Sequence, residues 1–187
     1  MANVKQADFD IPKNSKLTLY SLQLMDIMKK TDFQNDFNNF VDHLFLDCCA
    51  YVKNHLNPEE PVIKLVFIAK QAEYERIEKQ SNYYSHQREK PKGQTLGFAM
   101  TSNLENVIYL NFEPLTRLML KNLQTFVFNL AALYIHEILH CYYRSIKDEQ
   151  ETLDLTYKLL GNFLGMSLPK EMTPKASDFY TEDNLFR

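Results

Sequence analysis

The residues best suited to chemistry in this 187-residue chain are His136-Glu137-Ile138-Leu139-His140, which fit the pattern H-E-x-x-H. Two imidazoles four residues apart on a helix project from one face, so both can bind the same metal ion. A glutamate beside such a metal can accept a proton from water during hydrolysis. The pattern therefore predicts His136 and His140 as ligands of Zn²⁺ and Glu137 as a catalytic base.

The residues around this pattern favour a buried helix. Positions 125–143 contain no Gly or Pro and are mostly apolar. Ala132 and Asn129 share the helical face of His136, which places a small and a polar side chain beside the expected metal. The alternative is a core helix with two hydrogen-bonded histidines, but it would bury Glu137 at a high cost unless that carboxylate had a partner.

A catalytic zinc ion usually has three protein ligands, so a third donor is expected elsewhere. A metzincin would need Gly at position 143 and His at position 146, where this chain has Tyr143 and Ile146. Peptide deformylases use a cysteine from a Gly-Cys-Leu-Ser-type segment, whereas Cys48 and Cys49 occur in a predicted helix without that context. The remaining donors are the carboxylates at positions 148–154.

The histidine helix and the acidic helix after it resemble the gluzincins, especially the minimal forms of that family. The resemblance covers about residues 97–164: a hairpin, an active-site helix and a glutamate helix. It implies that a glutamate on the later helix completes the zinc site. It also implies that a strand before the active-site helix binds the substrate backbone by strand addition, for which Val107–Phe112 is the candidate.

Helix geometry ranks the possible third ligands. If the active-site helix ends near Ile146 and the chain turns straight back, residues near 151 return to the level of His140. Glu151 is therefore the expected ligand. Glu149 and Asp154 are the alternatives if the turn is longer or tighter than this geometry assumes.

The neighbours of Glu151 bear on its role. Glu151 shares a helical face with Leu155 and Leu159, so it is expected to point inward. Larger gluzincins have an acidic residue four positions after the ligand glutamate, where this chain has Leu155, so the usual second carboxylate is missing or is replaced by Asp154. The acidic cluster also suits a helix N-terminus, with Asp148 as its cap.

Together these features predict a zinc metalloendopeptidase whose partner is a peptide or protein substrate. Glu137 would take a proton from a zinc-activated water and return it to the leaving amine. One alternative is a zinc-binding but catalytically weak or latent regulatory protein, and another is a helical interaction protein in which the pattern is accidental. Several side chains near the pattern qualify as transition-state donors: Tyr142, Tyr143, Tyr157 and Arg144.

The elements expected to position these residues form one α+β, zincin-like domain over residues 1–187. Apolar residues at helical spacing, a β-branched run and a polar connection between two apolar runs define its parts. We expect N-terminal helices in 14–56, a small, mostly antiparallel sheet with a hairpin in 62–112, active-site and glutamate helices in 115–165, and an extended tail in 169–187.

Composition limits the other functions. The net charge of −3 and the pI near 6.0 give no basic face for nucleic acid. Three cysteines form no disulfide framework, which favours a reducing, cytoplasmic location. Residues 1–13 lack the apolar core of a signal peptide, and the apolar stretch Phe126–Leu139 is too short to span a membrane.

Overall fold

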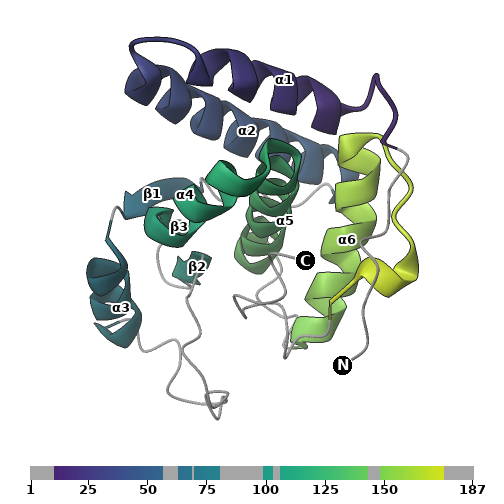
Figure 1. Ribbon diagram of the computed structural model, residues 1–187. Helices are drawn as coiled ribbons and strands as arrows, with labels where there is room; N and C mark the ends of the chain where they lie inside the picture. Colours follow the sequence, from purple (N-terminus) through teal and green to yellow (C-terminus); the bar gives the residue numbers. More distant parts are fainter. Residues whose placement is uncertain are drawn as a thin grey trace, which may run out of the picture.

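The computed structural model describes residues 11–56, 63–68, 70–80, 99–102, 106–142 and 148–174. Helices come first along the chain, then a small sheet, then further helices (Figure 1). The α+β class predicted from the sequence is confirmed. The predictions for Tyr143 and Arg144 and for the tail beyond residue 174 lie outside the described residues.

Two helices, α1 (Lys16–Met28) and α2 (Phe33–Leu56), pack side by side and form the upper layer of the fold in Figure 1. Ser15 begins α1, because its side-chain oxygen accepts a hydrogen bond from the Thr18 backbone N–H at 3.2 Å. Both helices have one buried apolar stripe that faces the rest of the protein. Both were predicted from the spacing of their apolar residues.

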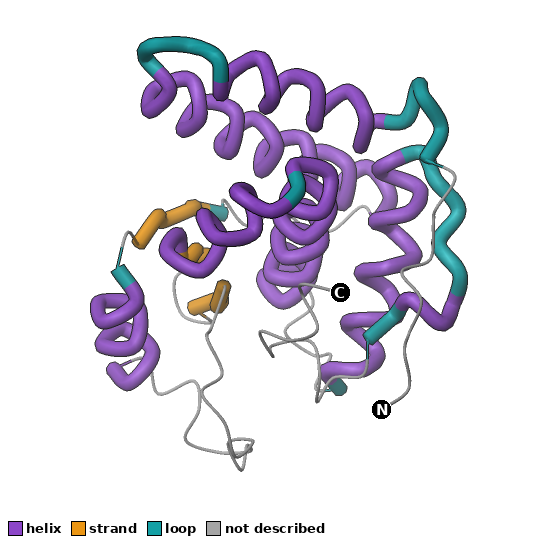
Figure 2. Tube along the Cα trace, in the orientation of Figure 1, coloured by secondary structure: helices purple, strands orange, loops and turns teal. Residues whose placement is uncertain are grey.

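The sheet contains β1 (Lys64–Ile68), β2 (Ala99–Ser102) and β3 (Val107–Asn111) in the order β1-β3-β2 (Figure 2). β2 and β3 pair antiparallel, which confirms the predicted hairpin, but β1 pairs parallel with β3. The sheet is therefore mixed, and the prediction of a mostly antiparallel sheet was wrong. The segment between β1 and β3 contains helix α3 (Gln71–Gln80) and β2, and it is long enough for the crossover that a parallel pair requires.

The helical region after the sheet is split into α4 (Phe112–Lys121) and α5 (Leu123–Tyr142). The split occurs at Asn122, whose Oδ1 accepts a hydrogen bond from the Thr125 backbone N–H at 3.0 Å and so caps α5. α5 is buried on nearly every side because α1, α2, α4, α6 and the sheet all pack against it (Figure 1). A helix that is apolar all round needs such an enclosed position.

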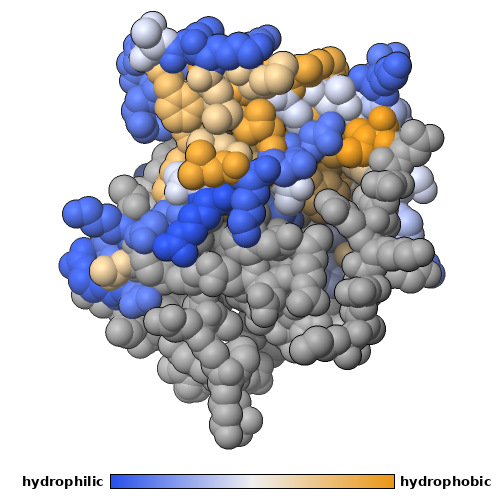
Figure 3. Space-filling view, viewed as in Figure 1, coloured by the Kyte–Doolittle hydropathy of each residue, from blue (hydrophilic) through white to orange (hydrophobic). Residues whose placement is uncertain are grey.

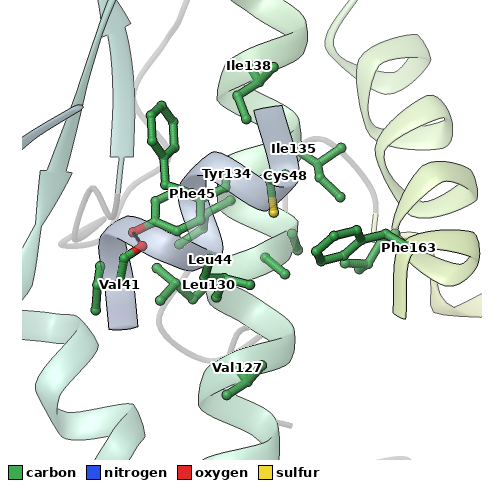
Figure 4. Packing of buried hydrophobic residues seen from close by; sticks show 14 of the residues in the cluster. Val41, Leu44, Phe45, Cys48, Val127, Leu130, Tyr134, Ile135, Ile138 and Phe163 are labelled. Carbon is green, nitrogen blue, oxygen red and sulfur yellow. Dashed lines mark hydrogen bonds between the residues drawn. The ribbon is translucent and has the colours of Figure 1, made fainter. Parts of the chain in front are cut away.

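The contact between α2 and α5 fixes which face of α5 is turned toward α2 (Figure 4). Tyr134 packs edge-on against Phe45 of α2, with ring centroids 5.3 Å apart, and its hydroxyl donates a hydrogen bond to the Val41 carbonyl at 3.4 Å. His136 follows two residues later, about 200° further round the helix. The packing of Tyr134 on α2 therefore directs His136 toward the opposite side, where α6 lies.

The last long helix, α6 (Glu149–Leu164), begins at Asp148, whose Oδ1 accepts from the Gln150 N–H at 2.9 Å. It ends at Gly165, which adopts the left-handed conformation with φ of 72°. The chain then returns along α6 through a short 3-10 helix (Lys170–Met172), and Gln150 donates to the Pro174 carbonyl at 3.2 Å. The first part of the C-terminal tail therefore lies against α6.

Apolar side chains also reach the surface of the layer formed by α1 and α2, in the upper part of the face in Figure 3. The most exposed of them are Leu19, Leu22, Met25, Met28 and Leu46. Within the described ranges, no helix has the length and apolar character needed to cross a membrane.

Candidate metal centre

Two histidines of α5 and one glutamate of α6 meet between these helices. His136 Nε2 lies 2.9 Å from Glu149 Oε1 and 3.0 Å from His140 Nε2, and His140 Nε2 lies 3.5 Å from Glu149 Oε2. The His136 side chain is fully buried, while those of His140 and Glu149 are 13% and 17% exposed. In the part of the chain that the structure describes, no other three His, Cys, Asp or Glu side chains converge in this way.

The inward face of α6 explains why Glu149 reaches the histidines. Thr152, Leu153 and Thr156 are almost completely buried and follow Glu149 by three, four and seven residues. These intervals keep a residue on the same helical face. Glu149 therefore extends the buried stripe of α6 to its first turn, where the stripe meets the end of α5.

The structure places the three candidates for the third ligand, which are Glu149, Glu151 and Asp154, in different surroundings. Glu151 is exposed and shares its side of α6 with exposed Asp154, so neither carboxylate joins the histidines. The expectation for Glu151 assumed that Leu155 marks the inward face, but Leu155 is only half-buried. The carboxylate that the structure brings to the two histidines is that of Glu149, which the sequence left as an alternative.

Two imidazole nitrogens and the two carboxylate oxygens of Glu149 converge at the site, and each of these atoms can present a lone pair. A carboxylate only accepts hydrogen bonds, and an imidazole nitrogen without a proton also only accepts. At separations of 2.9 to 3.5 Å, such atoms repel one another unless a proton or a metal ion lies between them. In the metal-free protein, ring protons of the histidines lie between these atoms, and a cation can take their place in this largely buried position.

The charge state of Glu149 suits a metal ligand. Burial raises the pKa of this carboxyl, but hydrogen bonds and electrostatic attraction from His136 and His140 outweigh burial and hold the pKa well below its usual range. Glu149 is therefore ionised at neutral pH. A group of one anionic oxygen and two imidazole nitrogens is a donor set that zinc commonly uses.

The distances also fit zinc. Tetrahedral zinc with bonds of about 2.0 to 2.2 Å places its ligand atoms about 3.3 Å from one another. The separations between the two imidazole nitrogens and from each nitrogen to a carboxylate oxygen of Glu149 lie on both sides of this value, so they are compatible with a shared ion. The residues present therefore fit a three-ligand zinc site.

The other ring nitrogen of His136 faces α6 deeper in the core. His136 Nδ1 lies 3.3 Å from Thr156 Oγ1, and Thr156 Oγ1 donates to the Thr152 carbonyl at 2.7 Å. The sequence suggested only Asp154 in place of a second carboxylate, whereas the group beside His136 Nδ1 in the structure is the hydroxyl of Thr156. The available signal was the pair of threonines four residues apart on the helix that contains Glu149.

Glu137 lies in the buried part of α5, with only 2% of its surface exposed. Asn129 and Ala132, which the sequence placed on the face of His136, are also buried. Cys141 is a buried core residue, and His43 and His55 are exposed. Tyr157 is buried and Tyr142 is half-buried, and burial raises the pKa of both hydroxyls.

The proposed role of strand Val107–Phe112 conflicts with the sheet order. β3 lies between β1 and β2 and forms backbone pairs on both sides, so it has no open edge for a substrate strand. The position of a strand within a sheet depends on pairing between distant segments. The local pattern of apolar residues did not contain this information.

Comparisons of the chain with protein-family models, curated proteins and solved structures give no match. The resemblance to gluzincins therefore stays an expectation that is based on the residues of the site.

Proposed function

We propose that this protein binds one zinc ion through His136, His140 and Glu149 and hydrolyses peptide bonds with Glu137 as the proton acceptor. The main support is the convergence of three donor atoms from an H-E-x-x-H helix and the helix after it. When bound, zinc acts as a Lewis acid and makes water a nucleophile near neutral pH. This proposal makes the protein a hydrolase of the gluzincin type with a zincin-like fold.

The protein side chains have separate tasks in this proposal. Glu137 accepts a proton from the attacking water and returns it to the leaving amine. It precedes His140 by three residues, so the two side chains occupy adjoining positions on α5. The buried setting of Glu137 and His136 strengthens electrostatic interactions with a developing charge, because few water molecules screen them.

A peptide or protein is the proposed substrate, and β2 is the strand suited to bind it. β1 and β2 are the two edge strands of the described sheet, and of these β2 packs near α5 (Figure 1). An extended peptide can add to such an edge by backbone hydrogen bonds. β2 therefore replaces β3 as the candidate for strand addition.

The cytoplasm is the proposed location. Cys48, Cys49 and Cys141 are free thiols in the structure. Free thiols persist in reducing compartments. Detection of the protein in a fractionated cell would test this location.

Zinc analysis combined with a cleavage assay tests the proposed function. Wild type and Glu137→Gln are compared, with the exposed Glu151→Gln as a matched control. We expect about one zinc ion per chain in all three proteins, and cleavage of unfolded protein substrates by wild type and the control only.

Two other results would contradict this proposal in different ways. Stoichiometric zinc without cleavage by any of the proteins would favour the alternative of a zinc-binding regulatory protein. Wild type that binds no zinc when supplied with the ion would refute the metal site itself.

A further inference from the structure

The ring of His136 is held on two sides. Its Nε2 faces Glu149 and His140, and its Nδ1 lies 3.3 Å from Thr156 Oγ1 on α6. His136 and Thr156 have no exposed surface, so bulk water does not compete for the contact between them. This contact is separate from the three atoms proposed to bind zinc.

The hydrogen-bonding pattern around Thr156 assigns a direction to this contact. A threonine hydroxyl has one proton to donate and two lone pairs. The 2.7 Å distance to the Thr152 carbonyl, which can only accept, takes that proton. A lone pair of Thr156 Oγ1 therefore faces His136, and the Nδ1 atom must be the donor across the 3.3 Å contact.

We propose that Thr156 is a positioning residue that accepts the Nδ1–H hydrogen bond of His136 and keeps Nε2 available for zinc. This inference rests on the proposed metal site and deepens it. A neutral imidazole with its proton on Nδ1 has its lone pair on Nε2, which is the form that binds metal through that atom. Thr156 thus selects the ring orientation and the tautomer together.

A carboxylate or a backbone carbonyl often accepts the hydrogen bond from the second ring nitrogen of a zinc-bound histidine. In this protein we assign that role to the Thr156 hydroxyl. The Thr156 hydroxyl donates a hydrogen bond to the Thr152 carbonyl. This bond polarises the hydroxyl and makes its oxygen a better acceptor. Unlike a carboxylate, it adds no negative charge to a buried region that already contains Glu137 and Glu149. This arrangement also accounts for the absence of an acidic residue on the buried face of α6 behind His136.

Three variants of α6 separate positioning from packing. Thr156→Val removes the acceptor and keeps the shape, and Thr156→Ser restores a hydroxyl. Thr152→Val is the matched control, because it removes a buried hydroxyl that donates to the Asp148 carbonyl at 3.3 Å and keeps the backbone carbonyl at position 152.

Zinc affinity, measured by competition with a chromogenic chelator, is the first measurement. Loss of a partner behind a ligand histidine costs about 10-fold to 100-fold in metal affinity. We expect a loss of that size in Thr156→Val, recovery to within about threefold of wild type in Thr156→Ser, and an unchanged affinity in Thr152→Val. Wild-type affinity in Thr156→Val, or equal losses in Thr156→Val and Thr152→Val, would overturn the inference.

Chemical denaturation of the metal-free protein is the second measurement, and it does not depend on zinc. His136→Gln removes the Nδ1 donor, so its shift in denaturation midpoint and that of Thr156→Val are expected to be non-additive in the double variant. The shifts of His136→Gln and Thr152→Val are expected to add. Additive shifts for the first pair would refute the hydrogen bond. If the shifts of His136→Gln and Thr156→Val are non-additive but the wild type binds no zinc, the proposed function is refuted and the hydrogen bond stands.

Discussion

Replacement of Glu149 by Gln tests which carboxylate completes the metal centre. Glu149 contacts both histidines, whereas Glu151 is exposed two residues later on the same helix. Loss of a residue that only orients a ligand costs about 10-fold to 100-fold in metal affinity. Because Glu149 is proposed to bind the ion directly, we expect Glu149→Gln to lose about 100-fold or more and Glu151→Gln to bind zinc as wild type does.

This loss of affinity translates into a measurable change in thermal stability. At a zinc concentration of about 1,000 times Kd, binding stabilises wild type by about 4.1 kcal/mol, and a 100-fold weaker site loses about 2.7 kcal/mol of that. For a domain of this size, each kcal/mol corresponds to about 2 to 4 °C, so the zinc-dependent rise in Tm is expected to shrink by about 5 to 11 °C.

Calorimetric scans with zinc and with chelator, on wild type and both variants, measure this change directly. The chelator scans also report any effect of each substitution on the metal-free fold. A wild-type zinc response in Glu149→Gln, together with a lost response in Glu151→Gln, would show that the assignment from the structure is wrong.

Two further predictions concern the core. Leu130→Ala removes a fully buried side chain of α5 and is expected to lower the free energy of unfolding by about 2 to 5 kcal/mol. The control is Leu120→Ala, at a position 77% exposed, which is expected to change the free energy of unfolding by about 0.5 kcal/mol or less. Urea denaturation measures both, and equal effects would contradict the assigned burial. Burial and the nearby Cys141 raise the pKa of Cys49 to about 12. The protonated thiol of Cys49 therefore stabilises the fold fully below the ordinary thiol pKa of about 8.5, and this stabilisation is lost as the pH rises toward 12. Stability measured from about pH 8 to 11 is therefore expected to fall more steeply in wild type than in Cys49→Ala, by up to about 1.4 kcal/mol per pH unit, and parallel curves would contradict this.

The parts of the fold that depend on neighbouring residues were predictable from the sequence. Ser15, Asp148 and Gly165 mark helix ends because capping needs only atoms within a few residues. His136 and His140 share a helical face for the same reason, since one helical turn separates them. Strand order was not predictable in this way, because the pairing of β1 with β3 joins segments about forty residues apart in the chain.

The sequence by itself determined the H-E-x-x-H pair and restricted the proposed third ligand to a short acidic run. Only the tertiary structure decided that Glu149 completes the group, because the choice depends on which face of α6 packs against α5. That face is formed in part by Thr152 and Thr156, which are buried in the structure. Because both side chains are polar, the sequence pattern does not predict that this face is buried. The same packing places Thr156 behind His136, a contact between residues twenty positions apart that no local pattern contains.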